Sequence, residues 1–224
     1  RRAVINLVYT QLLDGNHTLT ATVTDLTGKS ASASVSFKKV TTPVYIPLEG
    51  EVFYMPFEDE FYDVISGISA TAVGTPDFAE GIQGNAYIGA TDSYLNFPTT
   101  ELIKTKNITA AFWMKVNADP TRSGILTMSP EDVANPGYPG VQNLRTSGFR
   151  FFREGSAASQ QFKLNVGLGG TDESWNDGGN TDPTTGEWAH FAFTVSDTAS
   201  AIYINGVMIR ESKMLKPIDW TGCD

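Results

Sequence analysis

The chain is poor in cysteine and histidine, and this scarcity excludes several kinds of site. Its 224 residues include one cysteine, Cys223, and two histidines, His17 and His190. A disulfide needs two cysteines, and a structural zinc site needs four cysteine or histidine ligands. The sequence therefore excludes an internal disulfide framework and a zinc cluster. We expect Cys223 to act as a small buried apolar residue.

Basic residues are also scarce. Sixteen Lys and Arg stand against 25 Asp and Glu, which gives a net charge of −9. Proteins that bind nucleic acid or anionic membrane surfaces need a basic face that displaces counterions. The sequence therefore predicts no nucleic-acid partner. No apolar run approaches the about 20 residues of a membrane span, so we also expect no direct membrane insertion.

Glycine and aromatic residues, by contrast, are frequent, and they indicate short strands and tight turns. The chain contains 21 Gly and 11 Pro, and 11% of its residues are aromatic. In residues 188–195, Trp188 and His190 alternate with apolar residues, which is the period of a two-faced strand. Asn205-Gly206 lies between apolar runs and predicts a type I′ hairpin turn, because both central residues need positive φ. We predict an all-β protein.

Residues 1–40 are predicted to form a unit of their own. Three β runs, at residues 4–10, 18–24 and 31–37, are joined by turns rich in Asp and Gly. The segment of residues 13–30, LDGNHTLTATVTDLTGKS, resembles the closing strands of bacterial Ig-like domains. Since an Ig-like sandwich has about seven strands, the resemblance implies that residues 1–40 are the C-terminal strands of such a domain. Residues 41–49 hold two prolines, each of which favours extended geometry in the residue before it, and are predicted to be a linker.

The rest of the chain is predicted to contain many strands and two long loops. The loops are residues 129–147 and 169–186, and loops of this length are usually functional or mobile. The expected strands are residues 52–56, 84–88, 94–97, 108–116, 124–128, 149–153, 162–168, 188–195, 201–205 and 207–211.

Motifs across residues 53–211 resemble laminin G-like domains. They include Tyr54-Met-Pro-Phe-Glu, Gly81-x-x-Gly-Asn-Ala-Tyr, the strand around Trp113, Trp188-x-His and Tyr203-x-Asn-Gly. The resemblance implies a concanavalin A-like jelly-roll sandwich over residues 50–224. Family members continue with two or more strands after the Asn-Gly hairpin, so we expect this jelly roll to be truncated at its C-terminus.

The combination with an Ig-like tail resembles multi-domain surface lipoproteins of Bacteroidetes. It implies an exported protein at the cell surface or outside the cell, lipid-anchored through a part that is not in this sequence. The other domains of the parent protein would then be partners of this chain.

Catalysis is one hypothesis for such a fold. Retaining glycoside hydrolysis needs two carboxylates about 5 Å apart. The dense acidic cluster is Glu58-Asp59-Glu60, but with Glu60 and Asp63 it departs from the second and third acids of the glucanase motif Glu-x-Asp-x-x-Glu, and Pro56 before it favours a loop. We therefore assign no catalytic residue and expect a protein that is not an enzyme.

Calcium is a second hypothesis, because laminin G-like domains often hold one ion at a rim. Calcium takes six to eight oxygen ligands. The candidate ligands are Glu58, Asp63 and Asp92, and Asp172, Asp177 and Asp182 form a second group. The alternative is that these acids are solvated surface residues.

Carbohydrate binding is the third hypothesis. Sugar rings stack on aromatic side chains while amides and carboxylates bind their hydroxyls. Trp175 lies in the predicted polar loop 169–186 with Asn176, Asp177 and Asn180. Tyr138, Arg150, Phe149 and Phe152 would complete a binding surface. The alternative is that Trp175 plugs the end of the core. Trp113, Trp188, Phe112, Phe191 and Phe193 are predicted to be core residues.

The leading hypothesis is a non-catalytic carbohydrate-binding or adhesion module with a glycan partner. A structural or protein-interaction module without a sugar site is the first alternative. A glycoside hydrolase or lyase is the second, and the departure from the glucanase motif argues against it.

Overall fold

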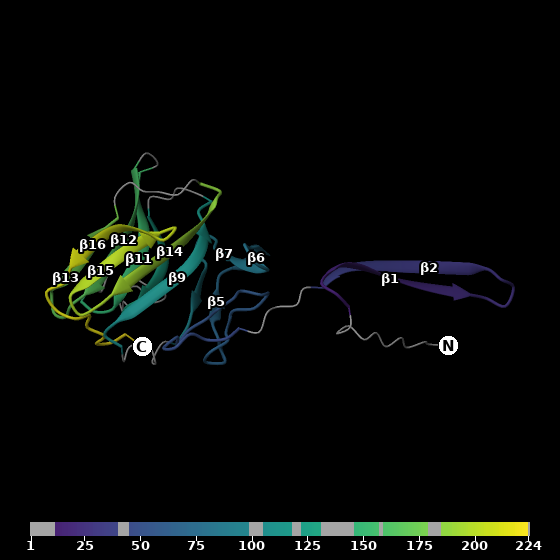
Figure 1. The fold of residues 1–224 in the computed structure, drawn as a ribbon, viewed down its shortest axis with the longest axis horizontal. Coiled ribbons are helices and arrows are strands. Elements are labelled where there is room, and N and C mark those ends of the chain that lie inside the picture. The colour runs from purple at the N-terminus through teal and green to yellow at the C-terminus, as the bar shows by residue number, and fades with distance from the viewer. Residues whose placement is uncertain are drawn as a thin grey trace. The chain divides into compact units, whose positions relative to one another are not determined.

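The chain forms two compact units, residues Arg1–Glu49 and Gly50–Asp224. The computed structural model describes residues 12–39, 45–98, 105–117, 122–130, 146–156, 159–178 and 185–223. Every regular element in these ranges is a β-strand (Figure 1). In the same ranges no helix is long and apolar enough to span a membrane.

The first unit contains a hairpin of β1 (Gly15–Thr24) and β2 (Ser30–Lys39). One face carries Thr–Ser pairs across the strands, such as Thr20–Ser34 with hydroxyl oxygens 2.8 Å apart. The other face carries apolar pairs such as Leu19 opposite Val35. The strand predicted at residues 4–10 lies outside the described residues, and the Ig-like nature of this unit stays a prediction.

The second unit contains two four-stranded antiparallel sheets. We call them sheet I and sheet II, and sheet II faces the viewer in Figure 1. In spatial order, sheet I is β10 (Arg122–Met128), β11 (Phe149–Ser156), β12 (Ser159–Gly167) and β13 (Glu173–Asp177), and sheet II is β16 (Val207–Lys213), β15 (Ala199–Ile204), β14 (Trp188–Val195) and β9 (Ile108–Lys115).

Aromatic rings from both sheets meet in the hydrophobic core. Phe151 of β11 packs on Phe193 of β14 with ring centroids 5.1 Å apart, and Phe162 of β12 packs on Phe191 of β14 at 4.7 Å. All four rings are at most 2% exposed. Burial of rings this size is the main favourable term in such a fold. The sheets therefore form a sandwich, and Phe191 and Phe193 are core residues as predicted.

Two predicted core residues lie outside this core. Trp113 and Trp188 occupy alternate positions to Phe112 and Phe191, so they point away from sheet I. Trp113 is 54% exposed. The prediction was wrong because alternation separates two faces of a strand but does not tell which one is buried when both carry aromatic rings.

Six short strands precede the sandwich in the chain and form three two-stranded ribbons, β3–β4, β5–β8 and β6–β7. Their bounds are β3 (Tyr62–Asp63), β4 (Ile68–Ser69), β5 (Thr71–Val73), β6 (Asp77–Glu80), β7 (Asn85–Ile88) and β8 (Tyr94–Asn96). The strand predicted at residues 52–56 does not form. Pro56 cannot donate a ladder hydrogen bond, and Phe57 turns the chain with φ of 62°.

Two local predictions are confirmed. Asn205 and Gly206 have φ of 51° and 76°, so both central residues of the β15–β16 hairpin are in the left-handed region. Cys223 is buried at 1% exposure in the core cluster.

A leucine-to-alanine substitution, made once inside the core and once on the surface, tests the position of the core. Leu164→Ala empties a site that is 0% exposed between the sheets, and we expect it to lower the free energy of unfolding by about 2–5 kcal/mol. Leu215→Ala, at a leucine that is 94% exposed, should change it by no more than about 0.5 kcal/mol. Urea unfolding measures both, and equal effects would contradict this core.

Candidate functional site

Trp175 lies on β13, on the face of sheet I that points away from the core. It is paired with Asn165 of β12. Its ring stands edge-on to that of Phe152 of β11, with centroids 6.0 Å apart and planes at 82°. The indole is half-buried. The predicted loop 169–186 was therefore wrong at this point, and Trp175 packs on the outside of the sandwich rather than plugging its core.

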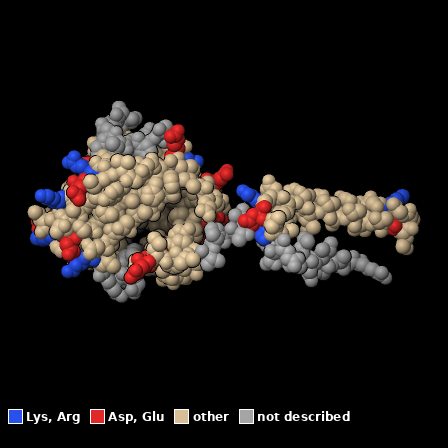
Figure 2. Space-filling model, in the orientation of Figure 1, with Lys and Arg blue, Asp and Glu red and all other residues tan. Residues whose placement is uncertain are grey.

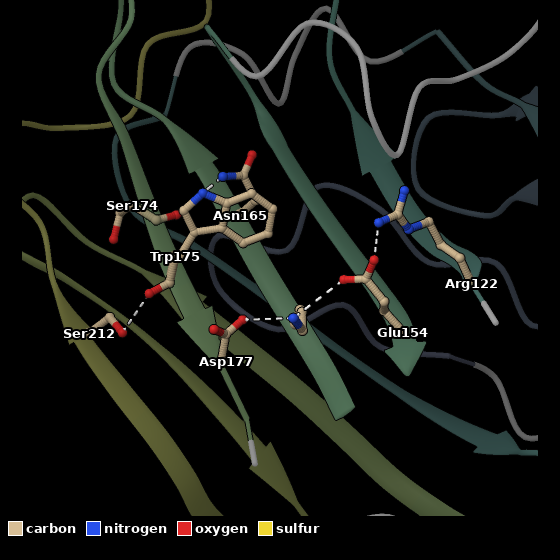
Figure 3. A network of polar contacts seen from close by, with 8 residues as sticks. Arg122, Glu154, Asn165, Ser174, Trp175, Asp177 and Ser212 are labelled. Atoms are coloured by element: carbon tan, nitrogen blue, oxygen red, sulfur yellow. Dashed lines mark hydrogen bonds and ion pairs between the residues drawn. The ribbon is translucent and has the colours of Figure 1, made fainter. Parts of the chain in front are cut away.

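A row of alternating charges crosses the same face (Figure 3). Arg122 of β10 pairs with Glu154 of β11. Lys163 of β12 lies between two carboxylates, with Nζ 3.3 Å from Oε2 of Glu154 and 3.4 Å from Oδ1 of Asp177. The row therefore reaches all four strands and ends beside Trp175, since Asp177 is two residues further along β13.

A second polar row lies beside Trp175 on the neighbouring strands. Nη1 of Arg150 donates to Oδ1 of Asn165 at 3.1 Å, and Nδ2 of Asn165 donates to Oε2 of Glu173 at 3.0 Å. Arg150 and Asn165 are 0% exposed. Because a buried Asn held at both ends cannot rotate freely, this row fixes the polar side chains next to the indole.

The outer face of sheet I therefore combines one aromatic surface with groups that donate and accept hydrogen bonds. We call this set the Trp175 face. Its exposed carboxylates accept from hydroxyls, and Lys163 and Arg122 donate to them. An arrangement of one ring and convergent polar groups suits a ligand that has both an apolar face and a hydroxylated rim. The members of the Trp175 face are Arg122, Arg150, Phe152, Glu154, Lys163, Asn165, Glu173, Trp175 and Asp177.

The structure brings together three of the predicted binding residues, Trp175, Asp177 and Arg150. Asn176 has to be removed from the set. Its side chain points to the opposite face, where Nδ2 donates to the carbonyls of Ser200 at 2.9 Å and Arg210 at 3.4 Å. It is 0% exposed and ties sheet I to sheet II. Phe149 is likewise turned into the core.

Two predicted binding residues, Tyr138 and Asn180, lie outside the described residues, as does Asp182. Sequence reasoning also missed several members of the Trp175 face. Glu154, Lys163 and Asn165 alternate with core residues along β11 and β12. Polar residues at every second position between apolar ones were the signal that would have found them.

The predicted calcium ligands are not brought together. Oε2 of Glu58 accepts from the amide of Asn85 at 3.2 Å, Asp92 is exposed in a turn, and Asp172 pairs with Lys216. Within the described ranges no three carboxylate, histidine or cysteine side chains gather as a metal group. The acids expected to bind calcium therefore do not form a ligand set there.

Asp63 has a structural role. Its Oδ1 accepts from the amides of Tyr54 at 2.7 Å and Ile65 at 3.2 Å, and its Oδ2 accepts from Ser66 at 3.0 Å. Burial alone would raise the pKa of this carboxyl. Hydrogen bonds from the hydroxyl of Ser66 and from these three amides outweigh burial and lower the pKa below its ordinary value.

This role predicts a pH-dependent stability. A lowered pKa in the folded state means that ionised Asp63 stabilises the fold above the ordinary value of 3.8, and that this contribution fades as the pH falls through the lower folded value. Asp63→Asn should therefore unfold more readily than wild type at pH 7, with a gap that narrows below pH 3.8. Denaturant unfolding across pH measures the gap.

Asp92→Asn serves as the control, because Asp92 is exposed and has φ of 54°, which Asn tolerates. It should show no such gap. If the difference in stability between Asp63→Asn and wild type depended on added calcium rather than on pH, the structural role would be contradicted.

Comparisons with known proteins place this fold in a family. Residues 89–223 match the family model described as the concanavalin A-like lectin/glucanases superfamily, of laminin G type. No curated protein matches the chain. Among solved structures, the chain is similar to domain 4 of AbnA, a GH43 extracellular arabinanase from Geobacillus stearothermophilus, solved in complex with arabinotriose. The TM-score is 0.56 at 19% identity, covering 77% of this chain and 79% of that domain chain.

The likeness to the arabinanase domain concerns the fold. The family match covers more than half of the chain, including both sheets of the sandwich and the Trp175 face. This chain belongs to the concanavalin A-like lectin/glucanases superfamily.

Proposed function

We propose that the second unit is a non-catalytic carbohydrate-binding module that holds a saccharide on the Trp175 face. The observation that carries the proposal is the position of Trp175. A partly exposed indole stands on a paired strand of the sheet, beside a row of ion pairs and a row of buried hydrogen bonds. A sugar ring can stack on the indole while its hydroxyls bind the neighbouring polar groups.

The charged groups of the ion-pair row beside the indole can be reached by a ligand. The side chains of Asp177 and Arg122 are 52% and 36% exposed, and those of Lys163 and Glu154 are partly exposed. Since they are already paired with one another, their orientation is set before a ligand arrives, which lowers the entropy cost of binding. Asp177 is the closest of the four to Trp175 in the chain and is the expected first acceptor for a sugar hydroxyl.

The same pairing argues against hydrolysis. A glycosidase needs one carboxyl kept protonated near neutral pH, usually by an apolar pocket or a neighbouring carboxylate. Glu154 and Asp177 instead share the ammonium group of Lys163. Glu58, the leading residue of the acidic cluster, is engaged by Asn85. This arrangement supports binding without cleavage.

The comparisons support the same proposal. The similar domain was solved with arabinotriose and is part of an extracellular arabinanase. We therefore include pentose polysaccharides among the ligands to be tested. We also propose that the parent protein is exported to the bacterial surface, where this unit would bring neighbouring domains to a polysaccharide.

The proposal predicts that Trp175→Ala weakens binding to a soluble polysaccharide. Affinity electrophoresis through gels that contain arabinan, xylan, galactan, mannan or β-glucan measures the retardation of each variant. We expect wild type to be retarded by at least one of them. We expect Trp175→Ala to weaken this binding by about tenfold or more, because the stacking surface is lost. Trp175→Phe should retain part of the affinity.

Asn176→Ala is the neighbouring control. It removes a tie between the sheets and should lower the stability by about 1–3 kcal/mol, yet leave the retardation of the folded protein unchanged, since its side chain faces away from the ligand. Retardation that survives Trp175→Ala would refute the site. Release of sugars from any of the polysaccharides would refute the non-catalytic role.

A further inference from the structure

The outer face of sheet II carries a second group of exposed aromatic residues. Trp113 of β9 is 54% exposed. It stands edge-on to the imidazole of His190 on β14, with ring centroids 5.3 Å apart and planes at 71°. We call each cross-strand pair on this face a rung. On the next rung along the same strands, Nζ of Lys115 lies 5.3 Å from the ring centroid of Trp188. Both contacts hold the rings of adjacent strands in place on the solvent side.

The next rung of this face is made of small residues. Ala111 of β9 pairs with Ala192 of β14, and Ala192 pairs with Tyr203 of β15. Residues two apart on a strand share a face, so Ala111 and Ala192 lie beside Trp113 and His190. The rung beyond them carries the hydroxyls of Thr109 and Thr194.

These residues form a shallow shelf with a small floor and aromatic sides. We call it the Trp113 shelf and define it by Trp113, Ala111, Ala192 and Tyr203. In Figure 2, charged side chains gather toward the edges of this face, and its centre is formed by uncharged residues. The hydroxyls of Thr109 and Thr194 and the imidazole of His190 border the floor.

We propose that the Trp113 shelf is a second binding site for an uncharged saccharide. The exposed indole offers a stacking surface, and the alanine floor lets a flat ring approach it closely. The threonine hydroxyls and His190 can donate to and accept from the ring hydroxyls. No ionised side chain belongs to the shelf, which favours a neutral ligand.

The shelf between Trp113 and Tyr203 has the width of a small saccharide. Trp113 and Tyr203 stand two strands apart and two residues apart along the strands, a separation of about 12 Å given the strand spacing and rise. That width suits one or two sugar rings.

The two sites lie on opposite sides of the sandwich. Trp175 is on the outer face of sheet I, Trp113 is on that of sheet II, and the aromatic core separates them. The inference shares the ligand class of the proposed function but not its site. A module with both sites would bind a polysaccharide more tightly than either site alone, because the second binding event on a chain is intramolecular.

The test compares Trp113→Ala, Trp175→Ala and the double variant in gels that contain arabinan, xylan, galactan, mannan or β-glucan. We expect Trp113→Ala to weaken retardation by about tenfold on at least one polysaccharide, the loss of one aromatic contact. The double variant should be weaker than either single variant. Leu215→Ala, at an exposed leucine outside both sites, is the control and should behave as wild type.

Ala111→Arg gives a second route to the same answer. It covers the floor of the shelf without removing a packed ring, because Ala111 is exposed. We expect it to weaken retardation as Trp113→Ala does, at unchanged stability.

Retardation that Trp113→Ala and Ala111→Arg leave unchanged would overturn the second site and leave the Trp175 site standing. If Trp113→Ala weakens retardation but Trp175→Ala does not, the second site stands and the first is refuted. If none of the polysaccharides retards the wild-type protein, both sites are overturned. A change of oligomeric state on gel filtration, with retardation unchanged, would show that this face is a protein interface instead.

Discussion

The packing of phenylalanine rings between the two sheets is the contact on which the rest of the structure depends. Phe151 and Phe162 of sheet I meet Phe193 and Phe191 of sheet II and are almost completely removed from water. Because strands alternate, burying one face of each strand commits the other face to the outside. The same contact therefore sets which residues of β9, β11, β12 and β14 a ligand can reach.

The two outer faces differ in chemistry, and this difference follows from the residues between the core positions. On sheet I those positions are mostly charged or amide side chains, which pair with one another around the partly exposed ring of Trp175. On β9 and β14 of sheet II half of them are alanine and threonine, and Trp113 stands beside these small residues. Sheet I thus offers an orienting network, and sheet II offers a stacking surface with few polar partners.

Sequence reasoning found most strands of the sandwich, because their alternation is regular and hairpin signals such as Asn205-Gly206 separate them. It missed β13, because Asp and Gly on both sides of Trp175 resemble a loop, and only pairing with β12 makes the segment a strand. It assigned Trp113 and Trp188 to the core, since the pattern of a strand does not reveal which of two aromatic faces is covered.

Within the site, sequence reasoning found Trp175, Asp177 and Arg150 by residue type. It did not find Lys163, Glu154 and Asn165, because their role comes from contacts between strands that are distant in sequence. Asn176 shows the converse, since a residue next to Trp175 in the chain faces the other way.

The central claim is that a saccharide stacks on Trp175. The most direct measurement is a titration with arabinotriose followed by the indole N–H signals of the four tryptophans in ¹⁵N-correlated NMR spectra. The indole N–H of Trp220 donates to the carbonyl of Thr105 at 2.6 Å and serves as an internal reference. The account predicts that the Trp175 signal shifts with a saturable dependence on ligand concentration while that of Trp220 stays in place. A Trp175 signal that remains still while others move would contradict it.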